Sequence, residues 1–161
     1  MNDDIKEYKA KFGSLTLCDG PENDFYWIGF VYSSDGLFLE KIPIYIFTKK
    51  QNLSKETIGF VEIIISNINE YLEKSIVFIK QTLIENSQEY KIQEKEKELL
   101  INEDILPIDL PEFTFWENSN EWMIRFAEGK FNICDPLGIG ITFKITEPFS
   151  VNNLEDSEFI G

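Results

Sequence analysis

The sequence lacks histidine and has few of the other residues on which common active sites depend. None of its 161 residues is histidine, and only two, Cys18 and Cys134, are cysteine. Without an imidazole, a Ser-His-Asp or Cys-His nucleophile and a zinc site with histidine ligands are excluded. Two cysteines so far apart do not describe a disulfide framework, so we expect two reduced thiols packed within strands.

Basic residues and long apolar runs are also scarce. The chain has 29 Asp and Glu against 15 Lys and Arg, a formal net charge of −14, so phosphate backbones and anionic membranes repel it. The longest aliphatic run, near residues 63–65, is far shorter than a membrane span, and residues 1–7 carry no signal-peptide pattern. We therefore expect a cytoplasmic protein that binds neither nucleic acid nor membrane.

The chain nevertheless has enough apolar material for a core. Hydrophobic residues make up 43% of it and aromatic residues 14%, with fourteen phenylalanines. A chain of this length suits one domain and can bury roughly two thirds of its unfolded surface. The composition therefore predicts a single folded domain over 1–161.

Residues 1–50 have the pattern of strands and turns. Aromatic and β-branched residues predict strands at 15–18, 25–32 and 42–47. Asp35-Gly36 predicts a hairpin at 33–36 with a return strand over 37–40, because glycine accepts a positive φ without strain. Pro43 lacks a backbone donor, which favours an edge strand or the first position of a strand.

The middle of the chain predicts one long amphipathic helix. Ser54 is a suitable N-cap, and Leu53 and Ile58 occupy the two positions of a hydrophobic staple. Apolar residues then recur at spacings of three and four as far as Leu83, over about seven turns of 3.6 residues. The alternating charges of residues 94–98 predict a short second helix with a solvated face, and the prolines of 105–111 predict a connector.

The last third of the chain returns to strands. They are predicted at 113–116, 122–127, 131–134 and 139–145, and the short loops between them predict antiparallel neighbours, hence a meander. Together the elements predict an α+β fold. An antiparallel meander comes first, then the long helix with its short companion, then a second antiparallel meander, with the helix packed on a sheet face.

Negative charge is concentrated in this last third. Residues 101–161 hold twelve acids and three bases, and no Lys or Arg occurs between Lys97 and Arg125. The same interval carries interleaved aromatic residues. Carboxylates steer an encounter with a basic protein, and aromatic anchors supply much of the binding energy. The interval therefore predicts a surface for a basic protein partner, with candidate partner-binding residues Asp109, Glu112, Trp116, Glu117, Glu121 and Arg125.

Period-two alternation separates the two faces of these strands. Trp122, Ile124 and Phe126 share a face that should pack on the helix, as should the apolar residues Ile139, Ile141, Phe143 and Ile145. The opposite face carries Trp116, Met123, Arg125, Thr142 and Lys144, of which Trp116 is the least expected. The alternative is that the aromatic residues face inward, that the acids only keep the protein soluble, and that Arg125 forms an ordinary surface ion pair.

Five stretches of the chain are distinctive: Phe12-Gly13-Ser14-Leu15, Phe25-Tyr26-Trp27-Ile28-Gly29, Ile42-Pro43-Ile44-Tyr45-Ile46, Glu121-Trp122-Met123-Ile124-Arg125-Phe126-Ala127-Glu128 and 133–143. Together with the long amphipathic helix they resemble small acidic bacterial proteins that belong to families described only as domains of unknown function. Some members lie near polymorphic toxin genes and resemble immunity proteins. The resemblance implies a cytoplasmic binder that neutralises a toxin, and it transfers no functional residues because the shared strings are strands and turns.

Catalytic and cofactor signals are weak. With 29 carboxylates, close acidic pairs arise by chance, so a glycosidase-like pair cannot be singled out. Gly138-Ile139-Gly140 precedes a strand rather than a helix, and residues 19–24 lack the glycine and glutamate positions of a calcium loop. We therefore expect a non-enzymatic interaction domain with no cofactor and no metal. The alternative is a small-molecule-binding or carboxylate-based enzymatic domain with a pocket between helix and sheet.

Overall fold

The computed structural model describes residues 6–33, 38–102, 104, 106–134 and 137–153. In this part of the chain the strands form one continuous sheet whose spatial order equals the sequence order. Its strands are β1 (Glu7–Ala10), β2 (Gly13–Asp19), β3 (Phe25–Val31), β4 (Ile42–Thr48), β5 (Ile108–Trp116), β6 (Glu121–Gly129), β7 (Ile139–Lys144) and β8 (Glu147–Asn153).

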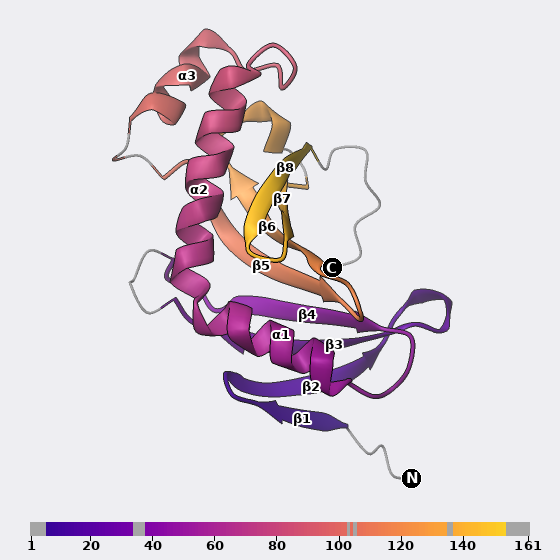
Figure 1. The fold of residues 1–161 in the computed structure, drawn as a ribbon. Coiled ribbons are helices and arrows are strands. Elements are labelled where there is room, and N and C mark those ends of the chain that lie inside the picture. The colour runs from indigo at the N-terminus through magenta and orange to yellow at the C-terminus, as the bar shows by residue number, and fades with distance from the viewer. Residues whose placement is uncertain (1–5, 34–37, 103, 105, 135–136, 154–161) are drawn as a thin grey trace.

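The predicted fold class, with two separate antiparallel meanders, is wrong. β4 and β5 pair in parallel, with Ile44 opposite Phe113 and Phe47 opposite Trp116, and so join the two halves into one mixed sheet (Figure 1). Every other neighbouring pair is antiparallel. A parallel pair needs a long crossover, which the helices between β4 and β5 supply. Short loops predict only local partners, and this pairing joins residues about seventy positions apart, such as Phe47 and Trp116.

The single long helix is also wrong, because the helical stretch is broken at Asn67. The structure has α1 (Lys55–Ser66) and α2 (Ile68–Glu85), and Asn67 between them has φ −117° and ψ 32°. Its amide side chain donates to the carbonyl of Ile63 at 3.0 Å. The break lets α1 lie over the β3–β4 half of the sheet while α2 passes the half formed by β5–β8 (Figure 1).

The N-terminal cap of α1 and the short second helix are confirmed. The hydroxyl of Ser54 accepts the backbone N–H of Thr57 at 3.1 Å, and the second helix is α3 (Glu94–Ile101). A fully solvated charged face is wrong, however, because Glu96 is buried. Its two carboxylate oxygens accept the backbone N–H groups of Gln93 and Asn132, each at 2.9 Å. One glutamate thus caps α3 and fastens it to the loop after β6.

The core lies between the helices and one face of the sheet. Trp122 is fully buried, its ring stacks on Phe143 at 4.2 Å, and Tyr71 of α2 meets it edge-on at 5.2 Å. Phe60 of α1 meets Phe115 in the same way. The predicted inward set is therefore confirmed except at Ile145, which is 51% exposed in the turn after β7.

Other local predictions are corrected or fall outside the described residues. Phe38–Glu40 form no strand, the hairpin tip at 34–37 is not described, and the strand at 131–134 is instead a 3-10 helix, η2 (Asn132–Cys134). Cys18 lies in β2 as expected, whereas Cys134 is buried outside any strand. Pro43 was expected on an edge strand or at the first position of a strand, but it is the second residue of the interior strand β4. It is tolerated there because the pairing of β4 with β5 begins only at the next residue, Ile44.

No helix in the described ranges is long and apolar enough to cross a membrane.

Candidate functional site

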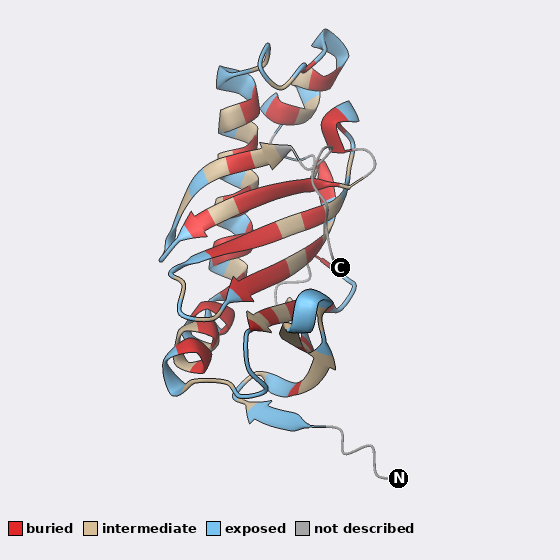
Figure 2. Cartoon of the chain, turned by 90° about the vertical axis from the view of Figure 1, so that its right-hand side faces the viewer, coloured by how far each residue is buried: buried red, intermediate tan, exposed pale blue. Residues whose placement is uncertain are grey.

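None of α1, α2 and α3 covers the sheet face turned away from α1 and α2 (Figure 2), and several aromatic side chains lie on this face. Because Phe115 and Trp122 point to the helices, their strand neighbours point to this opposite side. The strand register places Tyr26, Phe47 and Trp116 in one row across three strands. We call this surface the aromatic face. It is formed by Tyr26, Ile28, Tyr45, Phe47, Glu112, Thr114, Trp116, Met123 and Arg125.

The rings of the aromatic face contact one another across the strands. Trp116 stacks on Phe47 with ring centroids 6.5 Å apart and planes 20° apart. Tyr26 lies 5.7 Å from Phe47 and 6.1 Å from Tyr45. These cross-strand aromatic pairs stabilise the sheet, yet Trp116 remains 41% exposed. The row therefore ends in a large aromatic side chain that is available for contact.

A pocket of about 490 Å³ lies beside Trp116, at the ends of β4 and β5. It is not the predicted pocket between helix and sheet, because Tyr45, Phe47 and Trp116 belong to the opposite face. A smaller pocket of about 280 Å³ lies between α1 and the end of β5, and Glu56 is the only carboxylate among its lining residues. The lining of the larger pocket is Pro21, Asp24, Tyr45, Phe47, Thr48, Lys49, Thr114, Trp116, Glu117 and Asn118.

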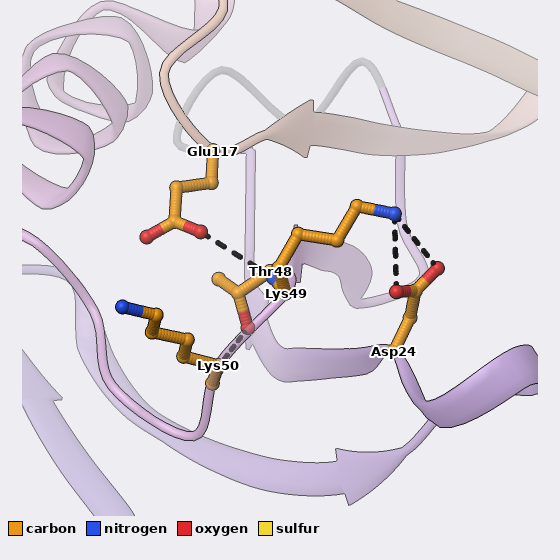
Figure 3. Close-up of polar contacts among 5 residues, drawn as sticks. All are labelled: Asp24, Thr48, Lys49, Lys50 and Glu117. Carbon is orange, nitrogen blue, oxygen red and sulfur yellow. Dashed lines mark hydrogen bonds and ion pairs between the residues drawn. The ribbon is translucent and has the colours of Figure 1, made fainter.

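Three charged residues flank this larger pocket (Figure 3). The ammonium of Lys49 lies 3.1 and 3.2 Å from the two carboxylate oxygens of Asp24. The Glu117 carboxylate accepts the backbone N–H of Lys49 at 3.4 Å, and the N–H of Glu117 donates to the carbonyl of Phe47 at 2.9 Å. The two carboxylates therefore lie on either side of a lysine whose side chain is 81% exposed.

The Asp24 carboxylate is positioned by a tight turn before β3. The 3-10 turn η1 (Pro21–Asn23) ends at Asp24, whose backbone N–H donates to the carbonyl of Pro21 at 3.0 Å. The N–H of Gly20 donates to the carbonyl of Asp24 at 2.8 Å, which closes the loop. This segment has the composition that superficially resembled a calcium loop, and the described residues contain no group of three potential metal ligands.

The structure brings only some of the predicted partner-binding residues together. Trp116 and Glu117 line the pocket. Glu112 and Arg125 lie on the same face but pair with each other at 2.9 Å, with their side chains only 16% and 12% exposed. Asp109 is seven residues before Trp116 on β5, roughly 20 Å away at the rise of a strand. Glu121 is exposed at the start of β6 and does not line the pocket.

The Arg125 side chain is bonded to other groups of the protein and is largely shielded from solvent. Its Nε donates to the carbonyl of Leu137 at 2.7 Å, and its Nη1 donates to Glu112. This pair also acts on Tyr45, whose phenol pKa is raised first by burial and then by the Glu112 carboxylate, with Arg125 opposing the shift. The pair therefore lies close enough to the pocket wall to affect its electrostatics.

Most residues of the pocket were not predicted from the sequence, among them Asp24, Tyr45, Phe47 and Lys49. The alternation within β4 did contain a signal, because Tyr45 and Phe47 alternate with Ile42, Ile44 and Ile46. It could not show that this row lies next to Trp116, since that neighbour depends on the parallel pairing of β4 with β5. Nor could it place Asp24 beside Lys49, because a loop contact has no periodicity.

Comparisons of the chain with protein-family models, with curated proteins and with solved structures find no match.

Proposed function

We propose that the protein is a non-enzymatic binding protein that holds a basic protein segment against the aromatic face, around Trp116. The observation that carries the proposal is a half-exposed tryptophan stacked on Phe47 at the wall of a pocket that Asp24 and Glu117 flank. Tryptophan is prominent among the residues that dominate protein interfaces, and an aromatic anchor beside a pocket is their usual setting.

The charge of the whole chain supports a basic partner. A net charge of −14 attracts cationic proteins from a distance and speeds their encounter. The toxin-neutralising, immunity-type role in the cytoplasm that the sequence resemblance implies is one biological form of such binding. The docking surface in this proposal differs from the one predicted from the acidic last third of the chain. It includes residues of β4 and η1, and it leaves out Asp109 and Glu121.

A matched pair of variants tests this proposal. The protein is immobilised and exposed to a lysate of its source organism at about 0.05 M and about 0.5 M salt. We expect one or more basic proteins to be retained at low salt, to be released at high salt, and to be lost in Trp116→Ala. Phe149→Ala is the control, because Phe149 is a 51% exposed aromatic on the edge strand β8.

Hydrogen exchange on the captured complex then locates the surface. Protection at the ends of β4 and β5 supports the proposal. Retention that Trp116→Ala leaves unchanged, or protection confined to other strands, contradicts it.

A second candidate function is small-molecule binding, and the pocket volume favours it. About 490 Å³ lies within the range of ligand pockets, roughly 300–1,000 Å³. A thermal-shift screen of neutral and cationic metabolites tests it. Stabilisation of the wild-type protein that is lost in Trp116→Ala supports this candidate over the first if the lysate experiment retains no protein.

A further inference from the structure

We infer that the pocket beside Trp116 receives one arginine side chain of the partner, and that Lys49 competes with this arginine for Asp24. The inference rests on the proposed function and names the chemistry of the partner's anchor. It is carried by the arrangement of three groups: an aromatic wall, two carboxylates, and a lysine of the chain itself already bound to one of them.

The aromatic wall suits a planar cation. The Trp116 and Phe47 rings stand on neighbouring strands with planes 20° apart, and both line the pocket, so the pocket has an aromatic wall. A guanidinium is flat and weakly hydrated, and it stacks on aromatic faces more readily than a compact ammonium does. The wall therefore favours arginine over lysine.

The carboxylates supply the matching charge. Asp24 and Glu117 both line the pocket with Trp116, and Figure 3 shows them on opposite sides of Lys49. A guanidinium has five N–H donors in a fixed fork that matches carboxylate geometry. An arginine stacked on Trp116 can thus donate to a carboxylate at its edge, which a neutral side chain cannot do with the same strength.

Lys49 occupies the position of an internal competitor. Its ammonium lies against both oxygens of Asp24, but its side chain is 81% exposed. Such an exposed pair is weak and easily exchanged. An incoming guanidinium therefore displaces the Lys49 ammonium from Asp24, and Lys49 lowers the affinity for a basic partner by an amount set by this exchange.

The neighbouring Lys50 provides a matched control. The Thr48 hydroxyl donates to the carbonyl of Lys50 at 2.6 Å and fixes the turn, and Figure 3 shows the side chains of Lys49 and Lys50 extending in opposite directions. Lys50 does not line the pocket. Replacing either lysine by methionine removes the same charge from the chain, so a difference between the two variants reports the local exchange.

The test uses short peptides of known chemistry. The tripeptides N-acetyl-Gly-Arg-Gly-amide, its lysine analogue and its citrulline analogue are titrated into the full chain, and the indole N–H signals are followed by NMR. Trp27 and Trp122 are buried, with 2% and 0% exposure, so their signals are internal references. We expect the arginine peptide to shift the Trp116 signal with a Kd of the order of 1–10 mM, and the citrulline peptide to leave it unmoved.

The variants separate local recognition from general attraction. Lys49→Met should tighten binding of the arginine peptide about two- to five-fold, whereas Lys50→Met should change it by less than about 1.5-fold. Glu117→Gln should weaken it about three- to ten-fold. A gain of affinity in Lys49→Met cannot arise from misfolding, so the test does not depend on a loss of function.

Three outcomes overturn the inference. They are an equal shift from the citrulline peptide, an equal affinity for the lysine peptide, and equal effects of Lys49→Met and Lys50→Met. Each of these leaves the proposed function standing if Trp116→Ala still abolishes capture of the basic partner. If capture survives in Trp116→Ala, the proposed function itself fails, whatever the peptides show.

Discussion

Replacing Arg125 by methionine should lower the free energy of unfolding by about 2–4 kcal/mol. The guanidinium donates to the Leu137 carbonyl at 2.7 Å and to the Glu112 carboxylate at 2.9 Å, and both charged side chains are less than one fifth exposed. A hydrogen bond that involves a charged group is worth about 1.5–3 kcal/mol, and loss of the arginine also leaves Glu112 without its cation. Methionine retains most of the apolar stem.

Urea unfolding followed by tryptophan fluorescence measures this loss. For a chain of this length, about 2–4 kcal/mol corresponds to a fall in Tm of roughly 4–16 °C. Lys144→Met is the control, because it removes one exposed positive charge from the same half of the sheet, and it should change the stability by no more than about 0.5 kcal/mol.

A double-mutant cycle with Glu112→Gln isolates the ion pair itself. We expect a coupling energy of about 1–3 kcal/mol, because the pair is largely shielded from solvent. A coupling energy below about 0.5 kcal/mol would refute the reasoning. It would mean that water screens the pair, and that Arg125 could contact a partner at little cost, as the sequence suggested.

The remaining predictions concern a cap, a glycine and a phenol. Glu96→Gln should cost about 2–4 kcal/mol in the same urea assay, since an amide replaces one of two acceptors for backbone N–H groups, whereas the exposed Glu98→Gln on the same helix should cost less than about 0.5. Gly138→Ala should lower Tm by several degrees, because Gly138 has φ +84° and a Cβ would collide with the backbone oxygen of Phe126. An unchanged Tm would contradict this backbone conformation of Gly138 and its close approach to Phe126. The raised pKa of Tyr45 means that the folded state holds the phenol proton more tightly than the unfolded state. The stabilisation is therefore complete below pH 10 and is lost as pH rises through the folded-state pKa. Tyr45→Phe should reduce this alkaline loss of stability, measured by unfolding at stepped pH, and an identical loss in the variant would exclude Tyr45 as its source.

Local patterns in the sequence predict several individual features correctly, although the predicted fold class is wrong. The cap at Ser54 forms because its hydroxyl accepts the N–H of Thr57, and period-two alternation correctly places Trp122 on the face that packs on the helices. These features depend on a few neighbouring residues. Side-chain alternation along a strand and the capping of a helix are set by the local backbone and do not require contacts with distant parts of the chain.

The helix break at Asn67 shows where periodicity fails. Ile64, Ile65 and Ile68 keep their spacing of three and four across the break, and all three are buried, so the apolar stripe passes through it unchanged. The break depends instead on the asparagine side chain, which bonds to the carbonyl of Ile63 and competes with helical continuation. A pattern of hydrophobic spacing contains no information on that competition.

Most of the candidate site could not be predicted, for a different reason. Trp116 and Glu117 stand out in a stretch without basic residues, but the pocket beside them also needs Phe47, Lys49 and Asp24. These residues reach Trp116 only because β4 and β5 pair in parallel, which joins residues about seventy positions apart in the chain. Asp109 and Glu121, which the acidic composition also singled out, do not line this pocket, since net charge gives no position in space.

We propose that Trp116 and its pocket form the docking site for a basic protein. Titration calorimetry of the captured partner against the wild-type protein, Trp116→Ala and Phe149→Ala tests it most directly. We predict that Trp116→Ala weakens the affinity by about tenfold or more, whereas Phe149→Ala, on the distant edge strand, changes it by less than about twofold. Equal affinities for the two variants would contradict the account.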